Sequence, residues 1–200
     1  KKGVEIRENC MLSGLKESGE GEIAVELNDG EIKASHVVVA TGALTPKLGD
    51  LLGWRAPIQP GKGYSLTMPR PQVCPETPMI FPETRVAVTP FPSGYRLGST
   101  MEFAGYDESM NPKRLELLRK GAEPYLREPY CEPVETAWFG WRPMTFDSVH
   151  IIGPCPGRRN VTLATGHNML GLSMAPATGK LVAAMVTGAA PSLHPEPYSA

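Results

Sequence analysis

The sequence contains no long apolar run: no stretch of its 200 residues approaches the roughly 20 apolar residues that a helix needs to span a bilayer. It also lacks an excess of either charge, with 20 Lys and Arg residues against 21 Asp and Glu residues. That balance argues against a general nucleic-acid binder, which would carry a concentrated basic patch. Because hydrophobic residues make up 41% of the chain, disorder is excluded as well. We expect a soluble globular chain with no nucleic-acid partner and no transmembrane segment.

Cysteine is scarce, and Cys10, Cys74, Cys131 and Cys155 form no Cys-x-x-Cys pair and have no histidine at zinc spacing. We expect four free thiols in a reducing compartment, with disulfides as the alternative, and no metal site. The first residues, KKGVEI, lack the apolar core of a secretory signal and lack an initiator Met. We therefore expect a cytoplasmic protein, and a chain that is part of something larger.

Proline is abundant, with 21 residues in 200 against a usual share of about 5%. Between about Ala56 and Thr100 the prolines separate short strand-like pieces, which indicates an antiparallel sheet with long connections. Before that region, the Asp29-Gly30 pair inside residues 22–33 predicts a β-hairpin, because glycine readily adopts the positive φ of a tight turn.

Two segments have helical patterns. Residues 112–126 repeat apolar residues at helical spacing and begin with a proline, which predicts an amphipathic helix. Residues 171–188 contain Lys180 as their only charge, which predicts a helix buried on nearly all sides. We expect that helix to start near Leu172, so that Pro176 lies in the first turn or just beyond it, where proline costs little.

Two segments place small or polar residues directly after a predicted strand. Residues 37–43, VVVATGA, have the continuous apolar pattern of a buried parallel strand, and ligands bind at the carboxyl ends of such strands. Residues 164–179 put a short loop between a strand and the apolar helix, where free N–H groups suit an anion or a ring carbonyl. Ordinary turns, with His167 as a packing residue, are the alternative interpretation.

A third segment, residues 139–153, carries Arg142 among uncharged residues. An isolated guanidinium in such a place is costly unless an anion meets it. It could pair with an internal acid such as Asp147, or it could receive the carboxylate of a substrate through two parallel hydrogen bonds. The residues alone leave both interpretations open.

Together these segments resemble the carboxyl-terminal half of the FAD-dependent D-amino-acid oxidase superfamily, which includes glycine oxidase, sarcosine oxidase and the bacterial D-amino-acid dehydrogenases. The resemblance covers nearly the whole chain, and the pieces that carry it are VVVATGA, PIQPGKGYSLT (57–67), GWRPMTFDSVHIIGP (140–154) and ATGHNMLGLSMAPATGKLVAAMVTG (164–188). The PGKGYSLT piece leans towards the D-amino-acid dehydrogenase branch. The Gly-x-Gly-x-x-Gly fingerprint that cradles the FAD pyrophosphate is absent, as is the acid that would hold the adenosine ribose.

The resemblance implies an α/β fold with α+β character, in which part of a Rossmann-like FAD domain is interwoven with an antiparallel-sheet substrate domain. We expect residues 1–56 and 138–200 in the FAD-binding domain and residues 57–137 in the substrate domain. Because the fingerprint is missing, we expect a partial flavoenzyme that is inactive by itself and holds no stoichiometric FAD.

The resemblance also implies site residues. Arg142 would bind the α-carboxylate of the substrate, and Tyr64 would line the pocket unless it is an ordinary sheet aromatic. No side chain would act as acid or base, because the family positions the α-hydrogen to leave as hydride towards flavin N5; Asp147 and His150 would be structural. The cofactor contacts would come from Leu12, Gly42, Gly166, His167, Asn168, Met169, Leu170, Gly171, Leu172 and Ser173.

The implied function is oxidation of a small D-amino acid or a glycine-like amine to an imino acid, which hydrolyses to a 2-oxo acid and ammonia. Oxidation of sarcosine, another secondary amine or a hydroxyproline isomer is a near alternative. A non-catalytic binding module of the same fold is an alternative of another class. The partner is a small molecule, with a homo-oligomer, an electron-acceptor protein and peripheral membrane association as open alternatives.

Overall fold

The computed structural model describes residues 3–200, which form strands, helices and short 3-10 turns. The strands are β1 (Leu12–Ser18), β2 (Glu22–Leu27), β3 (Gly30–Ala34), β4 (Val37–Val39), β5 (Ile58–Met68), β6 (Met79–Phe81), β7 (Val86–Phe91), β8 (Gly94–Glu102), β9 (Thr136–Thr145), β10 (Ile151–Pro154) and β11 (Val161–Thr165). The helices are α1 (Gly49–Leu52), α2 (Pro112–Ala122) and α3 (Gly171–Thr187), and the 3-10 turns are η1 (Gly19–Gly21), η2 (Gly42–Leu48) and η3 (Glu196–Tyr198).

The chain divides into two compact units. Unit 1 combines the residues up to Ile58 with Pro143–Ala200, and unit 2 is Gln59–Arg142. The sequence placed the corresponding boundaries after residues 56 and 137. The prediction of an α/β fold with an antiparallel sheet in the middle of the chain is confirmed.

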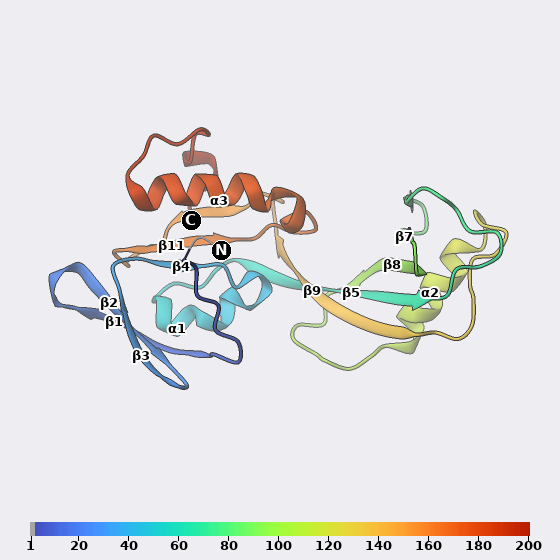
Figure 1. The fold of residues 1–200 in the computed structure, drawn as a ribbon, viewed down its shortest axis with the longest axis horizontal. Helices are drawn as coiled ribbons and strands as arrows, with labels where there is room; N and C mark the ends of the chain where they lie inside the picture. The colour runs from blue at the N-terminus through green and yellow to red at the C-terminus, as the bar shows by residue number, and fades with distance from the viewer. Residues whose placement is uncertain (1–2) are drawn as a thin grey trace. The chain divides into compact units, whose positions relative to one another are not determined.

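Unit 1 contains two small sheets. In the sheet of order β10-β11-β4, strands β4 and β11 run parallel, and Val39 lies opposite Leu163. The other sheet, β1-β2-β3, includes the hairpin that the Asp29-Gly30 pair predicted. In Figure 1, α3 lies along one side of β4 and β11, and α1 lies on the other side. A core that includes Leu15 and Leu52 packs β1, β2 and α1 against β4 and β11.

The burial of α3 differs from the sequence prediction. The helix starts at Gly171, one residue from the expected start, but only Leu181 and Val182 are buried. These two side chains pack against Ile152 of β10, whereas Leu172 is 92% exposed. The prediction of burial on nearly all sides is therefore wrong for residues 3–200, because a single sheet packs against this helix.

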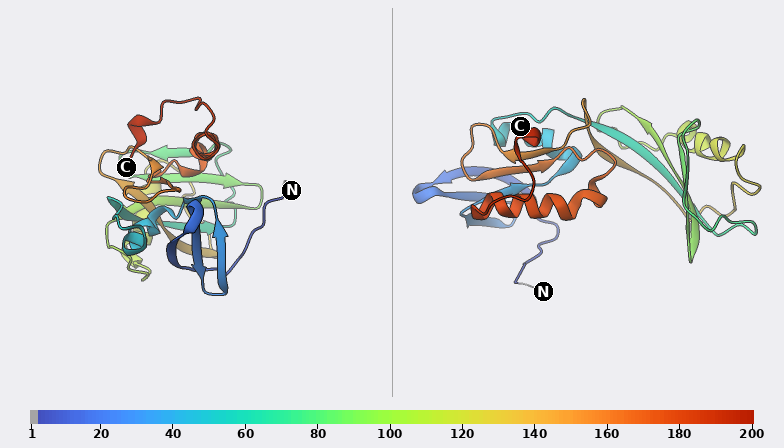
Figure 2. Two further views of the ribbon diagram at one scale, coloured as in Figure 1. Left: turned by 90° about the vertical axis from the view of Figure 1, so that its left-hand side faces the viewer. Right: turned by 90° about the horizontal axis from the view of Figure 1, so that it is seen from above.

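Unit 2 is built on a five-stranded sheet of order β6-β7-β8-β5-β9. Helix α2 covers one face of it (Figure 2), and Leu118 of the helix packs against Tyr64, Leu66 and Leu97 of the sheet. The helix ends at Ala122 rather than at residue 126 as predicted. Pro124 has no N–H group to donate to the carbonyl of Lys120, which explains the earlier end, although Glu123 itself keeps helical dihedrals of φ −52° and ψ −42°.

Alternate residues of β5 point to opposite faces of this sheet. Tyr64 belongs to the core under α2, whereas Thr67 contacts Arg96 of β8, and Gly63 contacts Arg142 of β9. We call the face that carries Gly63, Thr67, Arg96 and Arg142 the arginine face. It is the face of the sheet opposite α2.

Candidate functional site: the arginine face and the loop before helix α3

Arg142 ends unit 2 on strand β9, and its guanidinium group lies directly against the backbone of Gly63. Its Nη1 atom is buried and has no hydrogen-bond partner in the part of the chain that the structure describes. Burial lowers the pKa of Arg142, and no acidic neighbour within residues 3–200 opposes that effect. A buried cationic nitrogen without an acceptor costs free energy, so this position suits an anionic ligand.

The alternative for Arg142, an internal salt bridge with Asp147, is not found among residues 3–200. The Asp147 carboxylate instead accepts a hydrogen bond of 3.0 Å from the backbone N–H of Val149. No charged neighbour among the described residues contributes to the pKa of Arg142. The structure thus shows no salt bridge for Arg142 among residues 3–200, and its contact with a substrate carboxylate stays a prediction.

A second guanidinium on the arginine face was not singled out by the sequence. The Nε of Arg96 donates a hydrogen bond of 3.0 Å to Thr67 Oγ1. Its guanidinium carbon lies 4.9 Å from the ring centroid of Phe91 and 5.7 Å from that of Trp138. Arg96 is therefore held by a hydroxyl and two aromatic rings, whereas Arg142 has no such polar partner.

Tyr64 lies on the opposite face from Arg142. Its side chain is 1% exposed, and its hydroxyl donates a hydrogen bond to the carboxylate of Glu102. The structure thus favours the alternative that the sequence kept for Tyr64, an aromatic residue of the sheet core.

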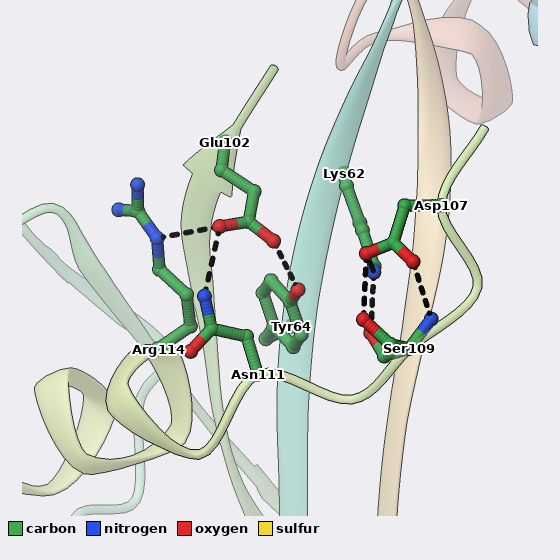
Figure 3. A network of polar contacts seen from close by, with 7 residues as sticks. All are labelled: Lys62, Tyr64, Glu102, Asp107, Ser109, Asn111 and Arg114. Atoms are coloured by element: carbon green, nitrogen blue, oxygen red, sulfur yellow. Dashed lines mark hydrogen bonds and ion pairs between the residues drawn. The ribbon is translucent and has the colours of Figure 1, made fainter. Parts of the chain in front are cut away.

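Figure 3 shows how polar contacts anchor strand β5 on the face of α2. Lys62 is fully buried, and its Nζ lies 3.1 Å from Asp107 Oδ2 and also donates to the carbonyl of Ser109. Its ammonium group lies 4.6 Å from the ring centroid of Phe139. Hydrogen bonds from Ser109 and Lys62 lower the pKa of Asp107 to about 2. Asp107 therefore stays ionised and keeps the buried ammonium paired.

The same network holds the start of α2. Glu102 Oε2 accepts hydrogen bonds of 3.1 Å from Asn111 Nδ2 and from Arg114 Nε. Asn111 also caps α2, since its Oδ1 accepts the N–H of Lys113. The hydrogen bond from Tyr64 is the largest of the effects that lower the pKa of Glu102. Strand β5, the end of β8 and the start of α2 are thereby fixed to one another.

In unit 1 the carboxyl ends of β4 and β11 bring two of the predicted segments together. Gly42, just after β4, has a φ of 55°, and its carbonyl accepts hydrogen bonds from Thr45 Oγ1 at 2.8 Å and from Thr165 Oγ1 at 3.1 Å. Since the two strands are parallel neighbours, Gly42 and Gly166 follow them at the same edge of the sheet. This edge is where ligands bind in such sheets.

The loop between β11 and α3 is held by Asn168. The Asn168 Nδ2 donates to Thr145 Oγ1 at 3.1 Å and to the carbonyl of Gly166 at 2.9 Å, while its Oδ1 accepts the N–H of Thr145 at 3.0 Å. Its backbone N–H donates to the carbonyl of Pro143 at 3.1 Å. The Asn168 side chain therefore positions the loop against the end of β9, a role that the sequence did not reveal.

The amino terminus of α3 presents free donors. The backbone N–H groups of Met169, Gly171, Leu172 and Ser173 find no acceptor among residues 3–200, and Leu170 provides no side-chain cap. The side chains of Met169 and Leu170 are 64% and 56% exposed. Uncapped N–H groups at a helix start carry partial positive charge, so they suit a carbonyl or an anion.

Leu12 lies on a different sheet from these glycines. It begins β1, pairs with Leu27 and is partly buried against the core of unit 1. The preceding residues are held by Asn28, whose Oδ1 accepts the N–H of Met11 at 2.8 Å and whose Nδ2 donates to the carbonyl of Asn9 at 3.1 Å. The structure thus gives Leu12 a packing role, and its cofactor contact stays a prediction.

His167 stacks on His150 beneath this loop, with ring centroids 4.6 Å apart and planes 18° apart. Its Nε2 lies 2.8 Å from Thr178 Oγ1, and the Nδ1 of His150 is buried without a partner among the described residues. Burial, with a smaller contribution from His150, lowers the pKa of His167 below its ordinary value of 6.5. The native state therefore favours neutral His167.

We expect acid to destabilise the protein through His167. A histidine with a lowered native pKa stabilises the fold above its unfolded pKa of about 6.5, and this contribution is lost as the pH falls below that value. Thermal melts between pH 7.5 and 5 should show a fall in Tm that His167→Gln reduces. His194→Gln, at an exposed position, is the matched control. An equal acid response of wild type and His167→Gln would contradict this prediction.

Other features of the described residues bear on the predictions from composition. All four cysteines are free thiols. Among residues 3–200, no three His, Cys, Asp or Glu side chains gather in a way that could hold a metal ion. Within the same range, none of the helices combines the length and apolar character needed to cross a membrane.

Comparison with known proteins identifies the family to which the chain belongs. The chain is 34% identical over 197 residues to a D-amino acid dehydrogenase of Granulibacter bethesdensis, a match that covers 96% of this chain and 46% of that protein. It is 33% identical over 199 residues to a glycine oxidase of Pseudomonas putida, covering 98% of this chain and 53% of that protein. The chain thus spans about half the length of the curated relatives it matches.

Solved structures share the fold. The crystal structure of glycine oxidase from Geobacillus kaustophilus matches with a TM-score of 0.85 at 24% identity, covering 95% of this chain and 51% of that one. An iminodiacetate oxidase from Chelativorans matches with a TM-score of 0.77 at 25% identity, covering 93% of this chain and 51% of that one. The family model described as FAD dependent oxidoreductase (DAO) matches residues 1–185. The chain therefore belongs to the DAO family of FAD-dependent oxidoreductases.

Proposed function

We propose that this chain forms the substrate-binding part, and half of the flavin site, of an enzyme that oxidises a small D-amino acid or a glycine-like amine. The observation that carries the proposal is the Nη1 atom of Arg142, which is buried without any acceptor among residues 3–200. Curated relatives of the chain are named as a D-amino acid dehydrogenase and a glycine oxidase. A carboxylate would supply the missing acceptor and the missing negative charge.

The residues of this chain fit part of an FAD site. The free N–H groups at the start of α3 suit a ring carbonyl, and Gly42 and Gly166 lie at the sheet edge where nucleotide cofactors bind. FAD, when bound, would accept the hydride from the α-carbon and so oxidise the amine to an imine, which water hydrolyses to a 2-oxo acid and ammonia. The sequence contains no Gly-x-Gly-x-x-Gly fingerprint for its pyrophosphate.

The work of this chain would be positioning. Arg142 would fix the α-carboxylate through its planar fork, and the loop held by Asn168 would keep the helix start in place. Asp147 is occupied by a backbone N–H, and His167 by Thr178. We therefore assign no acid or base among these residues. Sarcosine, other secondary amines and hydroxyproline isomers keep the same carboxylate and stay within the proposal as alternative substrates.

The test is substrate-driven reduction of the complete enzyme with FAD bound. Under anaerobic conditions, a panel of D-amino acids, glycine, sarcosine and hydroxyproline isomers should include one that bleaches the flavin absorbance. The matched control is the amine that lacks only the carboxylate, such as ethylamine against D-alanine. Because a charge-assisted contact contributes about 1.5–3 kcal/mol, the control should react about 10- to 100-fold more slowly. Equal rates for both, or no bleaching by any member of the panel, would contradict the proposal.

A further inference from the structure

Gly63 of β5 lies directly beneath the guanidinium of Arg142. A methyl group added at Gly63 would lie 2.6 Å from Arg142 Nη2 and closer still to Nη1 and Cζ. Carbon and nitrogen atoms in ordinary contact stay about 3.5 Å apart or more. The guanidinium can therefore rest in its present place only because residue 63 has no side chain.

We propose that Gly63 is a positioning residue for carboxylate recognition. Because it has no side chain, its backbone leaves the space in which the planar guanidinium group of Arg142 lies. The proposal rests on the proposed function of Arg142, and adds a requirement at a residue that does not itself touch the substrate. It also explains why the PGKGYSLT segment has a glycine at position 63. The backbone there does not require glycine, so the reason is the missing side chain.

The backbone of Gly63 supports this reason. Its φ lies outside the left-handed region, unlike that of Gly42 or Gly166. An alanine at position 63 can therefore adopt the native strand conformation without strain. Any effect of Gly63→Ala must then come from what the methyl group contacts, and its nearest contacts are atoms of Arg142.

The strand itself is held firmly from the other side. Lys62 and Tyr64, the two neighbours of Gly63, are 0% and 1% exposed, and both are tied to the segment before α2 through Asp107 and Glu102 (Figure 3). The Arg142 side chain, in contrast, has rotatable bonds and no polar partner at Nη1. When a methyl group is added, the guanidinium therefore moves and the strand stays.

The size of the effect follows from the distances. Nη1 would lie 1.6 Å from the methyl carbon and must move by about 2 Å to regain ordinary contact. A misplacement of only about 1 Å in a positioning group can already cost about 100-fold in rate. We expect Gly63→Ala to lower kcat/KM for the best amino acid by about 10- to 100-fold. Tm and FAD content should stay close to those of the wild type, because the methyl group meets the end of a flexible side chain.

The experiment uses the complete, FAD-loaded enzyme and four variants: Gly63→Ala, Arg142→Lys, the double variant and Gly98→Ala. Gly98 is the matched control, because its added methyl group would meet Ser65 Oγ at 3.4 Å and the Tyr64 carbonyl at 3.6 Å, away from Arg142. Acetate, which has a carboxylate but no amine to oxidise, is titrated by calorimetry. Steady-state kinetics and thermal melts complete the set.

If Gly63 acts through Arg142, Gly63→Ala weakens acetate binding at least 10-fold, Gly98→Ala does not, and the double variant loses no more than Arg142→Lys alone. Normal acetate binding by Gly63→Ala, or losses that multiply in the double variant, would overturn the inference while the proposed function stands. Unchanged acetate binding by Arg142→Lys would overturn both. If Gly63→Ala folds poorly, the double variant provides the test. Restored folding of the double variant supports the proposal that Gly63 positions Arg142, and continued misfolding refutes it.

Discussion

Arg142→Lys in the complete, FAD-loaded enzyme is expected to lower kcat/KM for amino acids by about 10- to 100-fold, because lysine keeps the charge but loses the planar fork. Arg142→Ala is expected to lose more. Both variants should keep their FAD content and nearly the wild-type Tm, because no buried acid among residues 3–200 is left unpaired when the guanidinium is removed. Steady-state kinetics on a panel of D-amino acids, beside thermal melts, measures both effects.

The control for this prediction is Arg119→Ala, an arginine of the same unit on an exposed part of α2. Arg119 lies near Glu116 and over the ring of Tyr130, away from the arginine face. Its removal should leave kcat/KM unchanged. A structural salt bridge at Arg142 would give the opposite pattern, a clear fall in Tm from an unpaired buried acid. An Arg142→Ala variant with normal kcat/KM would refute the proposal that Arg142 binds the α-carboxylate of the substrate.

Gly166→Ala is expected to destabilise the protein by about 2–5 kcal/mol, from two separate penalties. Gly166 has a φ of 73°, in the left-handed region that costs other residues about 1–2 kcal/mol. In addition, the methyl group would lie 2.9 Å from Thr145 Cγ2 and 3.3 Å from the backbone nitrogen of Ile151. Backbone atoms cannot move away as easily as the end of a flexible side chain can. Overpacking therefore adds about 1–3 kcal/mol to the destabilisation. Denaturant unfolding measures the sum.

Gly157→Ala separates the two penalties. Gly157 has a φ of 71°, but nothing lies within 4 Å of the added methyl group. It should therefore show only the conformational cost of about 1–2 kcal/mol. Equal losses for the two variants would mean that the contacts with Thr145 and Ile151 relax freely, and that the loop before α3 is less tightly seated than the structure indicates.

Local sequence patterns correctly predicted the elements that are determined by interactions between residues close together in the sequence. The Asp29-Gly30 pair sets a tight turn by its own backbone preferences, and the hairpin of β2 and β3 follows. The continuous apolar run before Thr41 predicted a parallel strand, and β4 does pair in parallel with β11. The predicted burial on both faces is wrong for residues 3–200, because Val38 is 43% exposed. The start of α3 was predicted to within one residue, also from a local pattern. Arg142 stood out because an isolated charge among uncharged residues is costly wherever the chain folds.

Contacts between distant segments were decided only by the tertiary structure. Composition predicted α3 as buried, yet burial depends on which surfaces pack against a helix, and within residues 3–200 only one sheet does. The side of the sheet that Tyr64 occupies depends on strand register, in which a shift of one residue exchanges the two faces. The place of Gly63 beneath Arg142 joins residues 79 positions apart, and Asn168 reaches Thr145 across 23. The sequence determined the residue types that can do this chemistry, and packing determined which of them meet, because proximity in a fold is set by the whole chain at once.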